Sequence, residues 1–305
     1  MRSLALSVPP APRLLRSERL RRAAQERAVW LADHAVRALI AEALLTPKPA
    51  LVDQRGPGAH QDLDLERLLR SAESLRGSFQ SMALQARGAV ADLQLREKLG
   101  AIGRHAERRM LSATGGSNAH RGAIWVLGLL VAALAIAEPG EELEKIAAIA
   151  AGLARLPDRY APQVPSNGSH ACRRFGVPGA RGEAASGFPH VLHVGLPALQ
   201  RARLCGADET RARLDALMAI MARLDDTCLL HRGGRPALNA AQAGAQRVLA
   251  LGGTSTAAGW GALLALDAEL LRRRASPGGC ADLLGACLLL DGVQSAGAKE
   301  QPWNA

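Results

Sequence analysis

The sequence predicts an all-α protein, a single domain of roughly ten helices with long functional loops. Apolar residues make up 48% of the 305-residue chain and aromatic residues only 3%, so aliphatic side chains must fill the core. Apolar residues also recur at helical spacing in one segment after another. No run of alternating apolar and polar residues, bounded by turn signals, predicts a strand.

The first predicted helix begins at Ser17, which can cap it, and continues to Leu45. The other helical patterns cover residues 64–85, 90–111, 124–137, 141–156, 183–204, 209–230, 237–251, 256–274 and 281–291. The Pro-, Gly- and Ser-rich stretch 157–182 could link two domains. Since long loops are often functional, we favour one domain, residues 17–292, with flexible ends at 1–16 and 293–305.

Charge and cysteine content narrow the class of protein. A net charge of +10 favours an anionic partner such as a nucleotide, a coenzyme or an acidic protein, although an Arg-rich surface without a target is an alternative. No dense basic run with interleaved aromatic residues predicts nucleic-acid binding. The five cysteines contain no CxxC pair, which argues against a zinc site or a disulfide framework and fits a reducing cytosol.

No segment predicts export or a membrane span. The N-terminal residues lack the apolar core and cleavage pattern of a signal peptide, so we expect a cytoplasmic protein. The most apolar run, residues 122–137, is shorter than the ~20 residues that a membrane helix requires. It is therefore expected to be a buried helix.

The first candidate site segment, LLTPKPALVDQRGPGAHQD (residues 44–62), interrupts a strongly helical region. Its three prolines and two glycines cannot continue a helix. Lys48, Asp53, His60 and Asp62 then lie on a rigid loop that carries both cations and carboxylates. Such a loop suits a substrate with phosphate groups and a metal ion, but it could also be a connector with solvated charges.

The second segment, TGGSNAHRGAIW (residues 114–125), leads from glycines into the apolar helix. Its backbone amides and the helix dipole favour a phosphate group, which Asn118, His120 and Arg121 could help to bind. The spacing GxxxxGK[ST] of a P-loop is absent. A simple Asn or Ser cap on the helix is the alternative.

Two further segments carry charged residues next to glycines. GVPGARGEAASGFP (residues 176–189) places Arg181 where its guanidinium and nearby amides could bind an anion, or it could be an ordinary turn. Glu183 could act as a base or as a first-turn acid of a helix.

RLDDTCLLHRGGRP (residues 223–236) places Asp225 and Asp226 near the predicted end of an apolar helix, where carboxylates oppose the helix dipole. This position predicts a metal ion or another cationic partner, or else a salt bridge to Arg223 or Arg232. A fifth segment, SPGGCADLLGACLLLDG (residues 276–292), leads into a helix in which Asp282 is a first-turn acid.

In this order, the five segments resemble those of the triphosphoribosyl-dephospho-coenzyme A synthase family, over about residues 35–292. TPKPALVD and LDDTCLLHR are most similar to the branch that serves malonate decarboxylase, while relatives that serve citrate lyase make the same product. The chain has Ala50 where many relatives have Gly and Arg121 where Lys is typical. The arginine keeps the charge but presents a planar fork.

The resemblance implies a transferase with ATP and 3′-dephospho-CoA as substrates. ATP would lose adenine, and its triphosphoribosyl group would be joined to the 2′-hydroxyl of dephospho-CoA. The product would become the prosthetic group of an acyl-carrier subunit. Carboxylates would stabilise positive charge on the ribose, a general base would activate the hydroxyl, and Mg²⁺ is the expected metal ion.

The resemblance also assigns roles to the charged residues of these segments. The catalytic candidates, which are also the candidate Mg²⁺ ligands, are Asp62, Asp225 and Asp226. The candidates for binding phosphate or substrate are Lys48, Asp53, His60, Asn118, His120, Arg121, Arg181 and Arg232. Two alternatives stay open: an all-α hydrolase of a nucleotide ribosyl bond, and a non-catalytic basic module that binds an acidic carrier protein.

Overall fold

The computed structural model describes residues 12–297, with side chains from residue 18 to 296, and every regular element in this range is helical. The prediction of an all-α fold is therefore confirmed. The helices are α1 (Pro12–Leu44), α2 (Leu65–Ser74), α3 (Arg76–Ala86), α4 (Leu93–Thr114), α5 (Arg121–Ile136), α6 (Leu143–Arg155), α7 (Asn167–Phe175), α8 (Gly179–Ala185), the π-helical η1 (Val191–Gly195), α9 (Leu196–Leu204), α10 (Glu209–Met221), α11 (Thr227–Ala250), α12 (Ala257–Arg272) and α13 (Gly278–Gly297).

The described residues contain more helices than predicted because several long patterns are divided. The pattern 64–85 becomes α2 and α3, which meet at the buried Leu75. The pattern 183–204 is divided after α8, where Gly187 and Phe188 have φ angles of 82° and 57°, outside the helical region. The connection 157–182 contains α7, so it is less irregular than expected.

The helices at the two ends extend further than predicted. α1 begins at Pro12 rather than Ser17, and α13 continues to Gly297 rather than ending near residue 291. Residues 12–16 and 293–297, which were expected to be flexible, are therefore helical. The remaining parts of the two predicted flexible ends lie outside the described residues.

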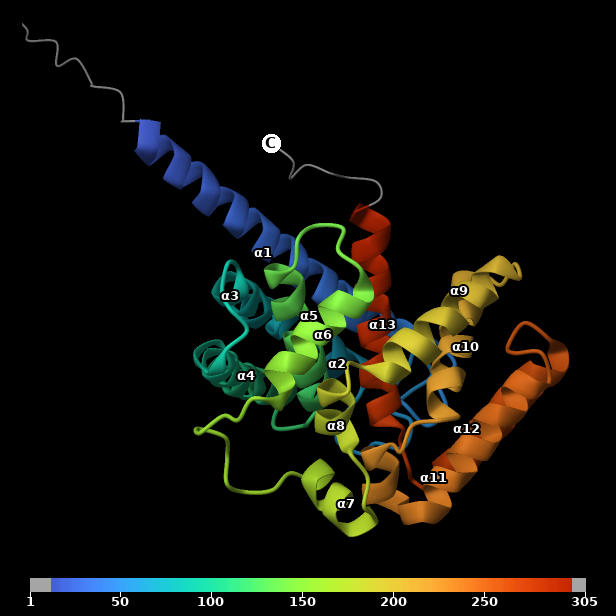
Figure 1. The fold of residues 1–305 in the computed structure, drawn as a ribbon. Helices are drawn as coiled ribbons and strands as arrows, with labels where there is room; N and C mark the ends of the chain where they lie inside the picture. The colour runs from blue at the N-terminus through green and yellow to red at the C-terminus, as the bar shows by residue number, and fades with distance from the viewer. Residues whose placement is uncertain (1–11, 298–305) are drawn as a thin grey trace, which may run out of the picture.

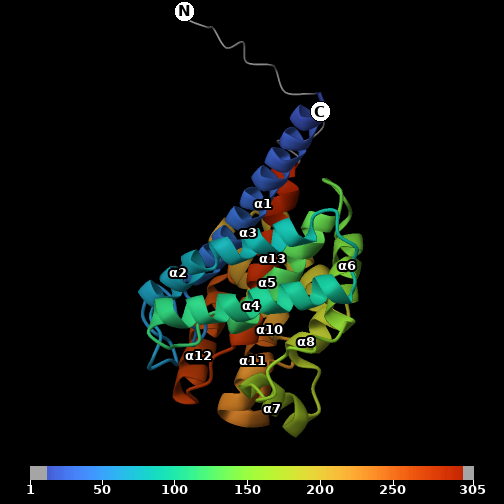
Figure 2. The same cartoon turned by 90° about the vertical axis from the view of Figure 1, so that its left-hand side faces the viewer.

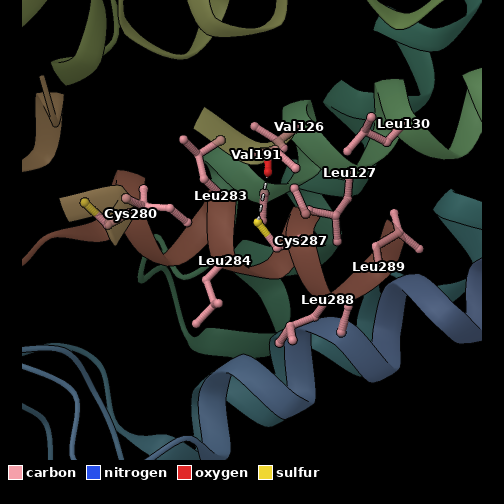
Figure 3. Packing of buried hydrophobic residues seen from close by; sticks show 14 of the residues in the cluster. Val126, Leu127, Leu130, Val191, Cys280, Leu283, Leu284, Cys287, Leu288 and Leu289 are labelled. Carbon is pink, nitrogen blue, oxygen red and sulfur yellow. Dashed lines mark hydrogen bonds between the residues drawn. The ribbon is translucent and has the colours of Figure 1, made fainter. Parts of the chain in front are cut away.

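Helices α5 and α13 form the centre of the molecule. Figure 1 shows them between α3 and α4 on one side and α9 to α12 on the other, and Figure 2 shows the same arrangement from the side. α13 contacts α1, α5, α10, α11 and η1. Figure 3 shows Leu127 of α5 beside Cys287 of α13. The Cys287 Sγ lies 3.8 Å from the Val191 carbonyl oxygen. Aliphatic side chains thus fill this part of the core, as the composition requires.

The apolar α5 is a core helix, as predicted. Its residues from Val126 to Leu134 are buried without interruption, although the helix has no polar face to mark its orientation. No helix in the described range is long and apolar enough to cross a membrane. All five cysteines are free thiols, in agreement with their scattered spacing.

Candidate active site at three helix N-termini

The opening loop, residues 45–64, buries the first predicted phosphate ligand. Lys48 is 1% exposed, and its ammonium donates to the Glu42 carboxylate at 2.5 Å and to the Glu42 carbonyl oxygen at 2.7 Å. Since both charges lie in the interior, each requires the other as a partner. In this structure Lys48 therefore neutralises Glu42 and holds the loop on the end of α1, where it does not face a phosphate.

Asp53 organises the same loop. Its carboxylate accepts the backbone amides of Lys48 and Arg55, each at 2.8 Å, and also pairs with the Arg55 guanidinium. The Arg55 guanidinium also pairs with the Asp267 carboxylate on α12 at 2.7 Å, and Asp267 accepts the Ala50 amide at 2.8 Å. The loop is therefore fixed by carboxylates as well as by proline. Ala50 has a φ of 54°, a left-handed conformation that explains why glycine suits this position.

His60 joins the opening loop to the fourth and fifth segments. Its Nε2 lies 3.0 Å from the Ser276 hydroxyl, and its Nδ1 lies 3.2 Å from the Arg232 guanidinium and 3.9 Å from the Asp62 carboxylate. Burial and the positive charge of Arg232 lower the pKa of His60 to about 4, with Asp62 acting in the opposite direction. His60 is therefore neutral at pH 7. His60, Asp62 and Arg232 are thus brought together, as expected for one site.

The second segment also packs against the opening loop, because the Ser117 hydroxyl donates to the Asp62 carbonyl oxygen at 2.5 Å. His120 is buried, with Nδ1 2.7 Å from the Ser71 hydroxyl and with Nε2 lacking a partner within the described residues. Burial and the nearby Lys48 lower its pKa to about 3. His120 is therefore a neutral interior group, which differs from a solvent-facing phosphate ligand.

Asn118 and Arg121 lie at the start of α5. The Asn118 side-chain oxygen accepts the Arg121 amide at 3.2 Å, while the N-cap position of α5 is His120, which makes no side-chain cap hydrogen bond. The Arg121 guanidinium lies 3.4 Å from the Glu107 carboxylate and remains 41% exposed. Arg121 can therefore still turn toward a bound anion.

Asp226 is the N-cap of a helix, and the predicted helix over 209–230 is wrong at this point. α10 ends at Met221 and α11 begins at Thr227. The buried Asp226 carboxylate accepts the amides of Cys228 at 2.7 Å and Leu229 at 3.3 Å. An aspartate at a helix N-terminus is favourable, so the inferred conflict with the helix dipole does not exist.

The same carboxylate connects two helices. The second oxygen of Asp226 accepts the Cys280 amide at the start of α13, at 2.8 Å. In the next turn of α13, the Asp282 carboxylate lies against Gly122 and interacts with the Ala123 amide at the start of α5. The N-termini of α5, α11 and α13 therefore converge around Asp226 and Asp282. Three positive helix ends at one point favour the binding of anionic groups.

Asp282 is a site residue whose importance the sequence did not indicate. It is half-buried, and burial together with the negative charges of Asp226 and Glu42 raises its pKa well above the usual range for aspartate. Sequence position alone made it a first-turn acid. The only available signal was the glycine pair 278–279, which allows α13 to begin against the Asp226 carboxylate.

The third segment reaches this region through α8. A side chain at Gly179 would overlap Cys172 and closely approach Thr227, so α8 begins close to the start of α11. Arg181 on α8 is exposed, and its guanidinium has no hydrogen bond or ion pair to the described residues. It is therefore available to an external anion.

Glu183 and Asp225 lie around His190. The buried Glu183 accepts His190 Nδ1 at 2.7 Å and the His190 amide at 2.9 Å, so it is paired rather than positioned as a base. Glu183 raises the pKa of His190, and the exposed Asp225 adds to the increase. Asp225 thus lies near the His190–Glu183 pair, whereas its neighbour Asp226 contacts the N-termini of α11 and α13.

The candidate Mg²⁺ ligands Asp62, Asp225 and Asp226 do not lie together as one cluster in the described part of the chain. Between residues 18 and 296, no three His, Cys, Asp or Glu side chains gather in a way that could hold a metal ion. Both oxygens of Asp226 accept backbone amides, while Asp62 and Asp225 are exposed at different places. Mg²⁺ is commonly bound by one or two carboxylates together with substrate phosphates, so isolated carboxylates are compatible with Mg²⁺ that arrives bound to a nucleotide.

Comparison with known proteins gives one consistent result. A family model described as ATP:dephospho-CoA triphosphoribosyl transferase matches residues 28–301. The 2-(5''-triphosphoribosyl)-3'-dephosphocoenzyme-A synthase of Klebsiella pneumoniae is 54% identical over 270 residues, which cover 88% of this chain and 96% of that protein.

Two further relatives carry the same name preceded by "probable". The protein of Pseudomonas fluorescens is 55% identical over 276 residues, 90% of this chain and 94% of its own length. That of Azotobacter vinelandii is 54% identical over 265 residues, 86% of this chain and 91% of its own length. No solved structure matches the chain. Because the family model and these relatives span most of the sequence, the chain belongs to the ATP:dephospho-CoA triphosphoribosyl transferase family.

Proposed function

We propose that this chain transfers the triphosphoribosyl group of ATP to the 2′-hydroxyl of 3′-dephospho-CoA and releases adenine. Membership of the family and the names of the relatives support this reaction. The structural observation that carries the proposal is the convergence of α5, α11 and α13, which brings together segments far apart in the sequence. The dipoles of the three helices favour anionic groups near this point.

The cations around this point have the chemistry that a triphosphate requires. Arg121, Arg181 and Arg232 are all exposed or partly exposed, and Arg181 has no partner within the described residues. Guanidinium groups bind phosphate through two parallel hydrogen bonds. These three residues, rather than the buried Lys48, are the proposed phosphate ligands. Mg²⁺ would enter with ATP, and Asp62, exposed beside His60 and Arg232, is the proposed contact for its water shell.

The carboxylates have a different purpose. Breaking the bond between ribose and adenine develops positive charge on the sugar, which fixed negative groups stabilise. Asp226 contributes by tying α11 to α13 and so by fixing the position of Asp282. Asp225 is exposed near the His190–Glu183 pair and is the proposed base for the attacking hydroxyl.

The product is proposed to serve as the prosthetic-group precursor of the acyl-carrier subunit of malonate decarboxylase. The segments TPKPALVD and LDDTCLLHR support this branch over citrate lyase. Disruption of the gene in its own host tests the assignment. Loss of growth on malonate with growth on citrate retained is expected, and the reverse pattern would refute the branch.

The reaction itself is tested with purified protein, ATP, Mg²⁺ and 3′-dephospho-CoA, with the products identified by mass spectrometry. Adenine and the coupled coenzyme product should appear in equal amounts, and omission of dephospho-CoA should stop the release of adenine. Release of adenine without the coupled product would make the protein a ribosyl hydrolase. No consumption of ATP would favour a binding module.

A further inference from the structure

Asp282 is the one carboxyl group at the junction of α5, α11 and α13 that is not wholly used by the fold. The Asp226 carboxylate is 1% exposed, and its two oxygens accept three backbone amides. Asp282 is half-buried and interacts with a single amide, that of Ala123. The fold therefore uses fewer of the hydrogen-bonding positions of Asp282 than of Asp226.

The backbone makes room for this carboxyl group. A side chain at Gly122, even a methyl group, would overlap the Asp282 carboxyl oxygen. Glycine is not needed here for its conformation, because Gly122 is not among the glycines with positive φ. The position therefore requires glycine for space, and that space is occupied by Asp282.

The groups around Asp282 come from four elements. Asp226 caps α11, and Glu42 on α1 is paired with Lys48 of the opening loop. His120 at the start of α5 is neutral, because burial and Lys48 lower its pKa to about 3. Arg232, farther along α11, is engaged with His60.

Asp226 and Glu42 act on Asp282 through their negative charge. Burial and these two charges raise the pKa of Asp282 well above the usual range for aspartate, which favours the protonated carboxyl group. A pair of carboxyl groups held in opposite protonation states is a recurrent arrangement for acid–base chemistry.

We propose that Asp282 is the general acid of the reaction, the group that gives its proton to adenine as the bond to ribose breaks. This role rests on the proposed function. The bond between ribose C1′ and adenine N9 breaks, and adenine takes the electron pair and the proton from Asp282. The bond between C1′ and the 2′-oxygen of dephospho-CoA forms, and that hydroxyl group loses its proton to solvent or a base. Solvent then returns a proton to Asp282.

The test compares Asp282→Asn with wild type on two substrates. One is MgATP, whose adenine needs a proton to leave. The other is 4-nitrophenyl ribofuranoside 5′-triphosphate, whose nitrophenolate leaves without a proton. General acid catalysis contributes about 10²–10⁴-fold to rate, so Asp282→Asn should lose at least about 100-fold with ATP. It should lose less than about tenfold with the nitrophenyl substrate. Equal losses on both substrates would overturn the proposal and make Asp282 a structural residue.

Asp215→Asn is the matched control. Asp215 is also a half-buried helical aspartate that accepts one backbone amide, from Thr254 at 2.7 Å, and it lies outside the site. Its activity should stay within about twofold of wild type, as surface and peripheral changes usually do. Coupled product formation by wild type is measured first, so failure of the proposed function is distinguished from failure of the acid role.

Two measurements keep the proposal testable if Asp282→Asn does not fold. Gly122→Ala should displace the Asp282 carboxyl group and reduce adenine release at least about tenfold, again with a smaller loss on the nitrophenyl substrate. In wild type, adenine release should fall as pH rises through the raised pKa of Asp282, while nitrophenolate release should not. Identical pH profiles for the two substrates would contradict the proposal.

Discussion

Substitution of Asp226 by alanine should destabilise the protein more than the loss of an ordinary helix cap. The change removes the acceptor for Cys228 and Leu229 at the start of α11, which by itself costs about 1 kcal/mol. It also removes the acceptor for Cys280, which is wholly buried. A buried amide without a partner costs about 1–3 kcal/mol. The expected total is therefore roughly 3 kcal/mol.

The size of the effect is set by the link between helices. Asp208 caps α10 in the same way, with its carboxylate on the Arg211 amide at 2.9 Å, but it is 63% exposed and reaches no second helix. Asp208→Ala should therefore cost only about 1 kcal/mol. Asp226→Asn should fall between the two, because asparagine keeps the cap of α11 but lacks a second acceptor for Cys280.

Thermal unfolding followed by circular dichroism measures these differences. For a protein of this size, roughly 3 kcal/mol corresponds to a decrease of about 5 °C in Tm, and 1 kcal/mol to about 2 °C. If Asp226→Ala lowers Tm by no more than Asp208→Ala does, the link between α11 and α13 does not contribute to stability as argued. If Asp226→Ala keeps its Tm but loses adenine release, the role of Asp226 is chemical rather than structural.

Three further predictions follow from the buried charges and the exposed arginine. Folding lowers the pKa of His60 to about 4 and that of His120 to about 3, so both residues bind protons more tightly in the unfolded protein, where their pKa is near 6.5. The free energy of unfolding should therefore be highest above about pH 6.5 and should decrease as pH falls toward 4. Urea unfolding at pH 7 and at pH 4.5 should show a loss of roughly 3 kcal/mol or more. Lys48→Met should lower the free energy of unfolding by about 3–5 kcal/mol, measured in urea, because Glu42 loses its partner, and the double variant with Glu42→Gln should regain most of that stability. Weaker ATP binding at unchanged stability would instead identify Lys48 as a phosphate ligand. Arg181→Ala should raise KM for MgATP about tenfold with little change in Tm, and an unchanged KM would remove Arg181 from the site.

The helical fold and the segments of the site were predictable because they depend on local pattern. Apolar spacing predicted α5 and α13 as helices, and the prolines and glycines of residues 44–62 predicted a loop. Helix ends were predicted less well. The apolar spacing of residues 209–230 does not change at Asp226, so the sequence pattern predicts one helix. The structure shows two, since α10 ends at Met221 and α11 begins at Thr227.

The roles of single charged residues required the tertiary structure. Lys48 and Arg181 are both basic residues beside prolines or glycines, and sequence alone treated them alike. Lys48 is buried against Glu42, which lies six residues earlier, whereas Arg181 is exposed. Asp226 and Asp282 differ in the same way, since the number of amides around each depends on where helices from distant segments begin.

By itself, the sequence determined an all-α chain, a buried aliphatic core and five polar segments that match one enzyme family, since helical period and motif order are properties of the chain. Only the tertiary structure decided that the N-termini of α5, α11 and α13 meet, that Lys48 is paired with Glu42, and that burial and nearby carboxylates raise the pKa of Asp282. The physical reason is that burial and charge–charge interaction depend on distances in space. Those distances join side chains and amides of separate segments, such as Asp226 with Cys280 and Gly122 with Asp282, and no local pattern records them.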